Sequence, residues 1–571
     1  MRKTLNLNVC HRILAALLFA GMLAGCVGGQ LGKNNSGQYK NGMVVSANAL
    51  ASEVGVSILK KGGNAVDAAV AVQFALAVVY PNAGNLGGGG FMVYRSAKGE
   101  TSTLDFREKA PGAAGRDMYL DASGNPIVEK SLYGPLAAGV PGSVAGMEEA
   151  HQKYGRLKWE DLIAPAVALA ADGFKITARQ ARELNGMKAR FSKLNPLGTA
   201  LVKESTWAEG DVLVQKELAA TLKRIKEHGR RGFYEGPVAD SIVAEMQRGN
   251  GIMTTQDLKD YRAVWRKPVT GTYRGYDIVT MPPPSSGGIA LIQLLKSVEP
   301  YPLSRWGFNT DSTVQLMVEA ERRVYADRAE YLGDPDFYPV PQTKLTETSY
   351  IRQRMSSFNW QKASTSAEIK AGEIAPPEHE ETTHFSIVDR EGNAVAITTT
   401  LNGSYGAGVV VKGAGFLLNN EMDDFSVKPG APNMYGLVGG EANAIAPQKR
   451  MLSSMTPAIL SKDGELFMVV GTPGGSTIIT SVFQTIVNVV DFNQSMQTAV
   501  NAKKFHHQWL PDQVDVEPNA LDSLTTVKLK AKGYKIVQRG AIGRVDAILK
   551  TKWGYYQGGA DPRGDDKMVG W

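Results

Sequence analysis

Two alternating segments in the second half of the chain constrain the fold more than any other feature. Residues 384–389 and 394–401 alternate like half-buried strands, and residues 390–393 between them have the composition of a tight turn. The pattern predicts an antiparallel β-hairpin. Residues 361–381 ahead of it are polar, weakly periodic and linker-like. Thr382 therefore stands where a linker meets a strand.

This position gives Thr382 a possible chemical role. A threonine hydroxyl is a poor nucleophile unless a base lies beside it, and cleavage of the chain before Thr382 would supply one as a new α-amine. Such an amine titrates at roughly 7.7–8.0, so it can accept a proton near neutral pH. An ordinary loop-to-strand junction is the alternative, and the threonine alone does not decide between the two.

The remaining periodicity predicts an α+β fold. The chain has 571 residues, of which 43% are hydrophobic and 21% charged, as in globular proteins. Helices are expected after Ser286, after Ser476, and at residues 50–59, 64–79, 144–154, 162–171, 216–226 and 313–331. Strands are expected at residues 91–94, 415–418 and 466–470. Helices around a predominantly antiparallel sheet core belong to the α+β class.

The first 25 residues have the pattern of a secretory signal, in which a basic stretch precedes a short apolar run at residues 13–20. The segment ends in Leu23-Ala24-Gly25-Cys26, which resembles a bacterial lipoprotein box with Cys26 as the lipidated residue. A plain signal peptide is the alternative. Residues 26–42 would then form a flexible tether. We therefore expect a periplasmic protein held to a membrane by a lipid anchor on Cys26.

Charge and cysteine content exclude some classes of protein. Three basic residues and no acidic one leave with the signal, so the net charge falls from +7 to +4. That charge is mild for a chain of this size and does not indicate nucleic-acid binding. Cys10 leaves as well, so Cys26 is the one cysteine of the mature chain and no intrachain disulfide can form.

Three common chemistries lack their sequence requirements. His379 and His384 are five residues apart and lie beside two prolines, whereas a zinc-protease helix needs histidines four apart. His506 and His507 are adjacent, so their side chains point in different directions. The Gly-x-Ser-x-Gly elbow of serine hydrolases does not occur. The glycine run at residues 87–90 lacks the Lys-Ser/Thr of a phosphate loop.

Polar residues downstream of Thr382 can complete a site around it. Thr400 and Asn402 lie one strand of the hairpin away. Residues 419–425 contain three acidic side chains, of which a pair can hold an amino group, and the serine pair Ser453–Ser454 offers hydroxyls. Gly474 and Gly475 precede a predicted helix, where free amides can form an oxyanion hole. Taken singly, each of these features also has a purely structural explanation.

Together these motifs closely resemble the γ-glutamyltranspeptidases, which belong to the N-terminal nucleophile hydrolases. The likeness includes Gly87-Gly88-Gly89-Gly90-Phe91 and Thr382-Thr383-His384. Further matching stretches are residues 62–69, 104–108, 282–288, 417–425, 452–457 and 505–509. The resemblance spans nearly the whole mature chain.

The resemblance implies a four-layer α-β-β-α sandwich built from one precursor that cleaves itself. The cut falls between Glu381 and Thr382, which leaves a large subunit of residues 43–381 and a small, catalytic subunit of residues 382–571 in one domain. Thr382 would attack the γ-carbonyl of glutathione or another γ-glutamyl compound and form an ester. Water, an amino acid or a dipeptide would resolve that ester. No cofactor is implied.

The resemblance also assigns the substrate contacts. Thr400 would support Thr382, and the amides of Gly474 and Gly475 would bind the oxyanion. Arg107, with Ser453 and Ser454, would bind the glutamyl α-carboxylate, because a forked donor suits a planar acceptor. The α-ammonium would be held by Asn402, Glu421 and Asp424. Residues 429–440, with Tyr435, resemble a lid loop over the pocket.

The sequence departs from the family pattern at three places. Glu421 replaces the glutamine of some bacterial members, Asn48-Ala49 replaces a His-Pro pair, and Tyr80 replaces a histidine. The last two are expected outside the site, so they bear on subfamily and substrate range. A cephalosporin-type acylase and a non-catalytic lipoprotein scaffold are the alternatives. Arg107 and Asp424 favour an amino-acid-like γ-glutamyl group over a simple acyl group.

Overall fold

The computed structural model describes residues 38–370 and 382–571, apart from residues 429, 432 and 435. The predicted hairpin is present as β10 (Thr383–Val388) and β11 (Ala394–Thr400), which pair antiparallel from Thr383 opposite Thr399. Asp389 shapes the turn, because its Oδ1 accepts hydrogen bonds from the backbone N–H groups of residues 391, 392 and 393 at 2.9–3.0 Å. Gly392 takes a φ of +93° there.

The hairpin forms the middle of an antiparallel sheet, between strands that come from the N-terminal half of the chain. β10 pairs with β2, and β11 pairs with β3. In order, the strands are β19 (Lys567–Gly570), β2 (Met43–Ser46), β10, β11, β3 (Gly89–Arg95), β4 (Thr101–Asp105) and β7 (Val264–Arg266).

A second antiparallel sheet packs face to face on the first. Within residues 39–571 its order is β18 (Tyr556–Gly559), β17 (Asp546–Lys550), β13 (Glu465–Gly471), β12 (Ala458–Lys462), β9 (Tyr276–Thr280) and β8 (Val269–Tyr273). The contact between the sheets is made mainly by β10 and β11 against β13 and β17.

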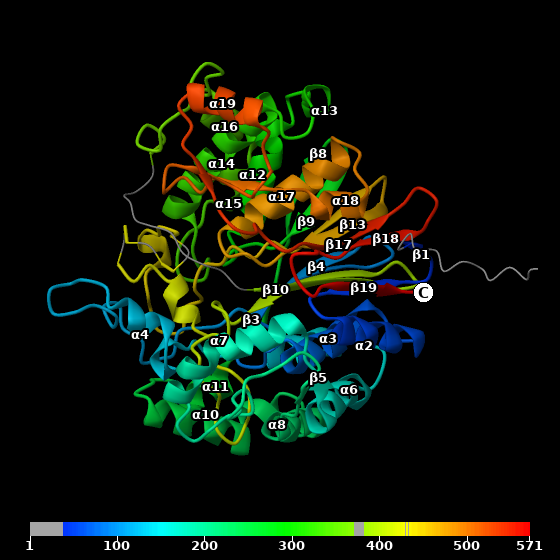
Figure 1. Ribbon diagram of the computed structural model, residues 1–571, viewed down its shortest axis with the longest axis vertical. Coiled ribbons are helices and arrows are strands. Elements are labelled where there is room, and N and C mark those ends of the chain that lie inside the picture. Colours follow the sequence, from blue (N-terminus) through cyan, green and yellow to red (C-terminus); the bar gives the residue numbers. More distant parts are fainter. Residues whose placement is uncertain (1–37, 371–381, 429, 432, 435) are drawn as a thin grey trace, which may run out of the picture. The chain divides into compact units, whose positions relative to one another are not determined.

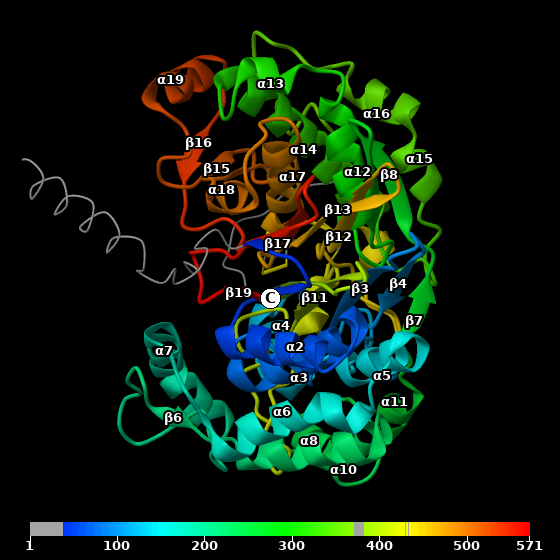
Figure 2. The same cartoon turned by 90° about the vertical axis from the view of Figure 1, so that its right-hand side faces the viewer.

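Side chains that alternate along the strands divide the interior into separate cores. Met43, Val388 and Ile459 belong to the core between the two sheets. Phe385 and Ile387 point to the opposite face of β10 and pack against helices. The second sheet has its own helix-covered core on its outer face. The four-layer α-β-β-α sandwich expected from the resemblance is therefore confirmed, and Figures 1 and 2 show the helices on both outer faces.

Two helices on the first sheet begin at asparagine caps. The side chain of Asn48 accepts from the N–H of Leu50 at 2.9 Å and starts α2 (Ala49–Lys60). Asn64 and Asp67 form a capping box for the fully buried α3 (Ala65–Val79). The other helices of this half are α5 (Ser143–Tyr154), α6 (Trp159–Asp172), α7 (Ala178–Leu194), α8 (Lys216–His228), α9 (Arg231–Tyr234), α10 (Pro237–Arg248) and α11 (Thr255–Asp260).

Two helices lie directly on the second sheet. They are α12 (Gly287–Val298), which contacts β8, and α17 (Thr477–Val490), which contacts β13. The long α14 (Asp311–Tyr331) packs on α12. The others in this part of the chain are α13 (Leu303–Trp306), α15 (Gln342–Thr346), α16 (Thr348–Met355), α18 (Met496–Asn501) and α19 (Ser523–Ala531). No helix in the described ranges is both long enough and apolar enough to span a membrane.

Short elements complete the part of the described chain that follows Tyr39. They are α4 (Val128–Leu132), the 3₁₀ turns η1 (Pro135–Ala137), η2 (Glu421–Asp424) and η3 (Glu441–Asn443), and the strands β5 (Phe174–Lys175), β6 (Val212–Leu213), β14 (Phe505–His506), β15 (Val514–Val516) and β16 (Ile536–Gln538).

Two expectations about secondary structure need correction. Residues 415–418 form no strand and make only isolated bridges, because each of Leu417 and Leu418 pairs with a different segment. Residues 361–370 are not a free linker. Trp509 Nε1 donates to the carbonyl oxygens of Ser366 and Ile369 at 3.0 and 2.7 Å, which anchors the segment.

Candidate active site

The two threonines of the hairpin meet at one end of the first sheet. Thr382 directly precedes β10 and Thr400 ends β11, and their hydroxyl oxygens lie 3.4 Å apart. Both side chains are buried, and the alternation of β10 and β11 points them toward the second sheet. The Thr400 hydroxyl also accepts from the N–H of Asn402 at 2.7 Å. Thr400 therefore links the position of Thr382 to the loop that carries Asn402.

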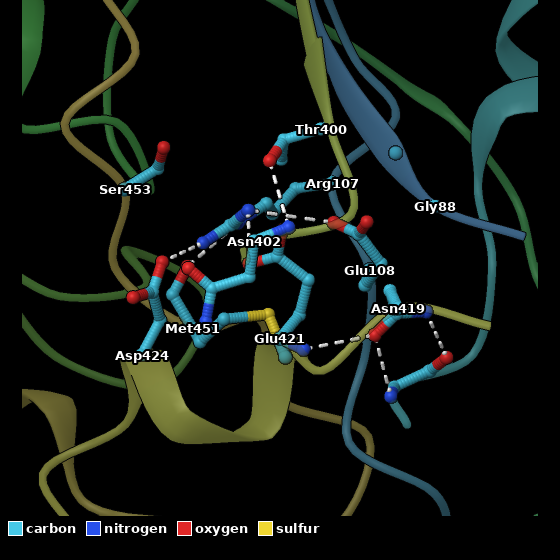
Figure 3. A network of polar contacts seen from close by, with 12 residues as sticks. Gly88, Arg107, Glu108, Thr400, Asn402, Asn419, Glu421, Asp424, Met451 and Ser453 are labelled. Carbon is cyan, nitrogen blue, oxygen red and sulfur yellow. Dashed lines mark hydrogen bonds and ion pairs between the residues drawn. The ribbon is translucent and has the colours of Figure 1, made fainter. Parts of the chain in front are cut away.

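A buried ion-pair cluster lies beside Thr400 (Figure 3) and lines the same cavity as Thr382. Arg107 Nη1 is 2.5 Å from Glu421 Oε2, and Arg107 Nη2 is 2.5 Å from Asp424 Oδ2. The carbonyl oxygens of Met451 and Leu452 accept further bonds from Arg107 at 3.4 and 3.3 Å. The structure thus brings the predicted carboxylate binder into direct contact with two of the three predicted ammonium binders.

Burial sets the electrostatics of this cluster. It raises the pKa of Glu421 well above its usual range and also raises that of Asp424, although the Arg107 charge opposes both shifts. Glu108, 3.5 Å from Arg107, has its pKa raised by burial to about 7. Burial by itself lowers the pKa of Arg107, but the surrounding carboxylates outweigh the effect of burial and raise this pKa. Each charge in the cluster is therefore stable only because of its partners.

The serine pair is held by the proline-rich turn at residues 282–288. Ser453 N donates to the Pro284 carbonyl at 2.9 Å, and Ser286 N donates to the Ser453 carbonyl at 2.8 Å. The Ser285 hydroxyl donates to the Met455 carbonyl at 2.6 Å. This turn therefore fixes the backbone that presents Ser453 and Ser454.

The glycine pair supplies free backbone donors. Gly474 and Gly475 lie between β13 and α17 with φ angles of +137° and +48°, which favour glycine. Neither of their N–H groups has a hydrogen-bond acceptor in the described parts of the chain. Gly475 lines the same cavity as Thr382, and Gly474 lines a neighbouring cavity of about 600 Å³. A free donor in the cavity of the Thr382 hydroxyl, with a second free donor on the adjacent residue, has the composition of an oxyanion hole.

The cavity at the threonines collects most of the residues predicted for the site, but its volume is only about 20 Å³. Its lining consists of Arg107, Arg328, Thr382, Thr400, Asn402, Glu421, Asp424, Leu437, Ser453, Ser454, Met455, Gly475 and Ile478. Leu437 belongs to the expected lid loop, whereas Arg328, Met455 and Ile478 were not predicted. The sequence contains one weak indication that Arg328 is buried. The helix α14 carries charged residues on every face and not on one solvated side.

Three predicted residues cannot be placed. Cys26, Glu381 and Tyr435 lie outside the described residues. The described part of the expected lid does reach the site. Asn433 Nδ2 donates to Asp424 Oδ1 at 3.0 Å, and Met434 N donates to Asp423 Oδ2 at 2.8 Å. Asn48 caps a helix, and Tyr80 accepts from Arg544 at 2.8 Å, so neither departure from the family pattern lines the site cavity.

The histidines have structural partners. His384 Nδ1 lies 2.9 Å from Thr398 Oγ1, and its Nε2 lies 3.0 Å from Ser386 Oγ. Burial lowers the pKa of His384 to about 3, so the ring is neutral near pH 7. His506 contacts Thr480, whereas His507 contacts Asp512. Within residues 38–370 and 382–571 no group of three His, Cys, Asp or Glu side chains is arranged to hold a metal ion.

A four-layer sandwich with a threonine hydroxyl at the start of a central strand defines the class of N-terminal nucleophile hydrolases. The family described as gamma-glutamyltranspeptidase matches residues 51–571. The glutathione hydrolase proenzyme of Escherichia coli K12 is 49% identical over 93% of this chain and 92% of its own length. The chain belongs to the γ-glutamyltranspeptidase family.

Solved structures agree with this assignment. The crystal structure of a cephalosporin acylase from Bacillus halodurans superimposes with a TM-score of 0.83 at 28% identity, covering 94% of this chain and 97% of that one. Helicobacter pylori gamma-glutamyltranspeptidase is 46% identical, with a TM-score of 0.57, over 60% of this chain and 97% of that one.

Proposed function

We propose that this chain is a self-processing γ-glutamyltransferase and glutathione hydrolase. The observation that carries the proposal is the contact between Thr382 and Thr400 beside the Arg107–Glu421–Asp424 cluster, in one cavity. Self-processing is supported by the proenzyme name of the Escherichia coli relative. Cleavage between Glu381 and Thr382 yields a large and a small subunit that remain together as a heterodimer.

The chemistry follows from the groups at the site. The new α-amine of Thr382 takes the hydroxyl proton as Oγ1 attacks the γ-carbonyl of the donor. Negative charge develops on the carbonyl oxygen and is stabilised by the N–H groups of Gly474 and Gly475. The donor amine then leaves with a proton, and a γ-glutamyl ester remains on Thr382. Water resolves this ester to glutamate, or the amine of an amino acid or dipeptide takes the γ-glutamyl group.

Recognition of the glutamyl end works by exchange of ion-pair partners. A cavity of about 20 Å³ has room for about one water molecule, so the substrate must displace the internal ion pairs. The α-ammonium of the substrate replaces Arg107 as the partner of Glu421 and Asp424, with Asn402 beside them. The α-carboxylate takes the released Arg107, and the Ser453 and Ser454 hydroxyls donate to it. The substrate's zwitterionic end therefore supplies a new partner for each charge of the internal ion pairs that it breaks.

A cephalosporin-type acylase is the second candidate, because the Bacillus halodurans acylase has a closely similar fold. The ion-pair cluster favours the γ-glutamyl assignment. An acyl group without an ammonium would leave Glu421 and Asp424 buried without a cation once Arg107 moved to the substrate, and unpaired buried charges are costly.

Replacing Thr382 by Ala tests the proposal, with Thr383→Val as the matched control. Thr383 is the next residue but lies on the opposite face of β10, and valine keeps its shape. Wild type and Thr383→Val should give two bands on a denaturing gel, with Thr382 as the first residue of the smaller one, and should release glutamate from glutathione. Thr382→Ala should stay one chain without activity. Cleavage that persists in Thr382→Ala would overturn the assignment.

The N-terminal pattern supports a further part of the proposal, namely that the protein is a periplasmic lipoprotein anchored through Cys26. Cells fed radiolabelled palmitate should label the wild-type protein and Cys10→Ala, since Cys10 lies within the signal. Cys26→Ala should remain unlabelled. Equal label in Cys26→Ala would refute Cys26 as the lipidated residue, and an unlabelled wild-type protein would leave only a plain secretory signal.

A further inference from the structure

Arg328 on α14 is a buried cation at the active site to which the mechanism above gives no role. Its guanidinium lines the cavity with Thr382, and its side chain is buried. Arg328 Nε donates to the Ser286 hydroxyl at 2.9 Å, and Nη2 donates to the Ser454 hydroxyl at 3.1 Å. Both partners are neutral.

The two arginines of the cavity differ in their ion pairs. Arg107 is within 3.5 Å of three carboxylates, which belong to Glu108, Glu421 and Asp424. Among the described residues, no carboxylate lies within ion-pair distance of Arg328. A buried charge without a counter-ion is costly unless a ligand supplies one. Burial accordingly lowers the pKa of Arg328 to about 10, although nearby Asp424 acts against the shift.

The position of Arg328 indicates which ligand group supplies the counter-charge. Ser286 accepts from Arg328 and donates its own hydroxyl proton to the Ser453 carbonyl at 2.6 Å. Arg328 is therefore fixed to the segment that carries Ser453 and Ser454, on the side of the cavity where hydroxyl donors gather. A planar guanidinium next to two hydroxyls suits a carboxylate.

We propose that Arg328 is a second cationic binder of the substrate α-carboxylate, acting together with Arg107. The inference rests on the proposed γ-glutamyl specificity. When the substrate ammonium takes Glu421 and Asp424, the cavity is left with two guanidinium groups and one incoming carboxylate. Arg328 makes the site favour donors that carry this carboxylate over those that lack it.

Two anilide substrates isolate this contact. The 4-aminobutanoyl anilide of 4-nitroaniline equals the γ-glutamyl anilide without its α-carboxylate. For Arg328→Gln we expect kcat/KM on the γ-glutamyl anilide to fall by about tenfold or more, the usual range for a hydrogen-bonded charge. Turnover of the 4-aminobutanoyl anilide should stay within about twofold of wild type, which a merely structural role for Arg328 does not predict.

Arg323→Gln is the matched control on the same helix. Arg323 is equally buried and pairs with Glu319, but it does not line the cavity. This variant should lose thermal stability and keep the wild-type ratio of the two substrates. Equal loss on both substrates in Arg328→Gln would overturn the proposal. Wild-type protein that turns over neither anilide would refute the proposed function instead.

A second variant covers failure of Arg328→Gln to fold or to cleave, which a denaturing gel reveals. Arg328→Lys keeps the charge but loses the forked geometry. Its preference for the γ-glutamyl over the 4-aminobutanoyl anilide should fall severalfold. An unchanged preference in Arg328→Lys, with normal cleavage, would overturn the proposal.

Discussion

Replacing Glu421 by Gln tests whether a pair of carboxylates holds the substrate ammonium. Glu421 is fully buried, and its Oε2 lies 2.5 Å from Arg107 Nη1. The change keeps the shape and one acceptor oxygen but removes one negative charge. It therefore alters the electrostatics of the ammonium subsite with little change in packing.

The size of the effect follows from the loss of charge. Hydrogen bonds to charged groups contribute about 1.5–3 kcal/mol, and neutral ones about 0.5–1.5 kcal/mol. The difference of roughly 1–1.5 kcal/mol corresponds to about a five- to tenfold rise in KM. Because the ammonium is bound equally in the ground state and the transition state, kcat should change little.

Stability should not suffer in this variant. Burial raises the folded-state pKa of Glu421 above its unfolded value. A carboxylate with a raised folded pKa destabilises the fold at pH values above its unfolded pKa, and this cost is present at pH 7. Its removal offsets the loss of one of the three carboxylates that Arg107 contacts, so Tm should stay nearly unchanged.

The assay compares the γ-glutamyl anilide with the glutaryl anilide, which lacks the α-ammonium. Glu421→Gln should raise KM for the first substrate only. Glu108→Gln is the control, because Glu108 is also fully buried and contacts Arg107 at 3.5 Å but does not line the cavity. The reasoning is refuted if both substrates respond equally, or if Glu108→Gln reproduces the selective effect.

Two further predictions concern Thr400 and His384. Thr400→Val removes the acceptor of the buried Asn402 N–H. An unsatisfied buried donor costs about 1–3 kcal/mol. The loop that carries Asn402 should therefore shift, and kcat should fall by roughly tenfold on any γ-glutamyl donor. An unchanged kcat in fully cleaved protein would contradict the role of Thr400. The folded pKa of His384 is about 3, below its unfolded value of about 6.5, so its contribution to stability is present above pH 6.5 and is lost as the pH falls. Between pH 7.5 and pH 5 this loss is about 2 kcal/mol, and His384→Gln should show a smaller drop in Tm over that interval; an equal drop would contradict the assigned pKa.

Local chemistry made part of the fold predictable from the sequence. Asn64 caps α3 through contacts within four residues, and the turn at residues 389–393 closes on its own aspartate. The hairpin fixes which faces of β10 point inward, so the meeting of Thr382 and Thr400 follows from its register. Such features need no knowledge of the rest of the chain.

Other features depend on segments far away in the sequence. Leu417 and Leu418 look like a strand, but their pairing partners come from two separate segments. The charges of α14 lie on every face of the helix, so its pattern does not reveal that Arg328 in particular is buried against Ser286 and Ser454. Hydrophobic periodicity reports how one segment alternates and does not report what will cover it. The family resemblance supplied the grouping of the site residues, and it did not include Arg328.

The order of strands in the first sheet has a consequence for the protein after cleavage. β10, β11 and β19 come from residues 382–571, whereas β2 and β3 come from the N-terminal part and lie directly against them. Separation of the two subunits would break the hydrogen bonds of three strand pairs of this sheet, namely β2–β10, β2–β19 and β11–β3. Dilution alone should therefore never separate them, and the covalent link is dispensable once folding is complete. Because Thr383 is already part of a ladder, the new terminus can relocate by little more than one residue.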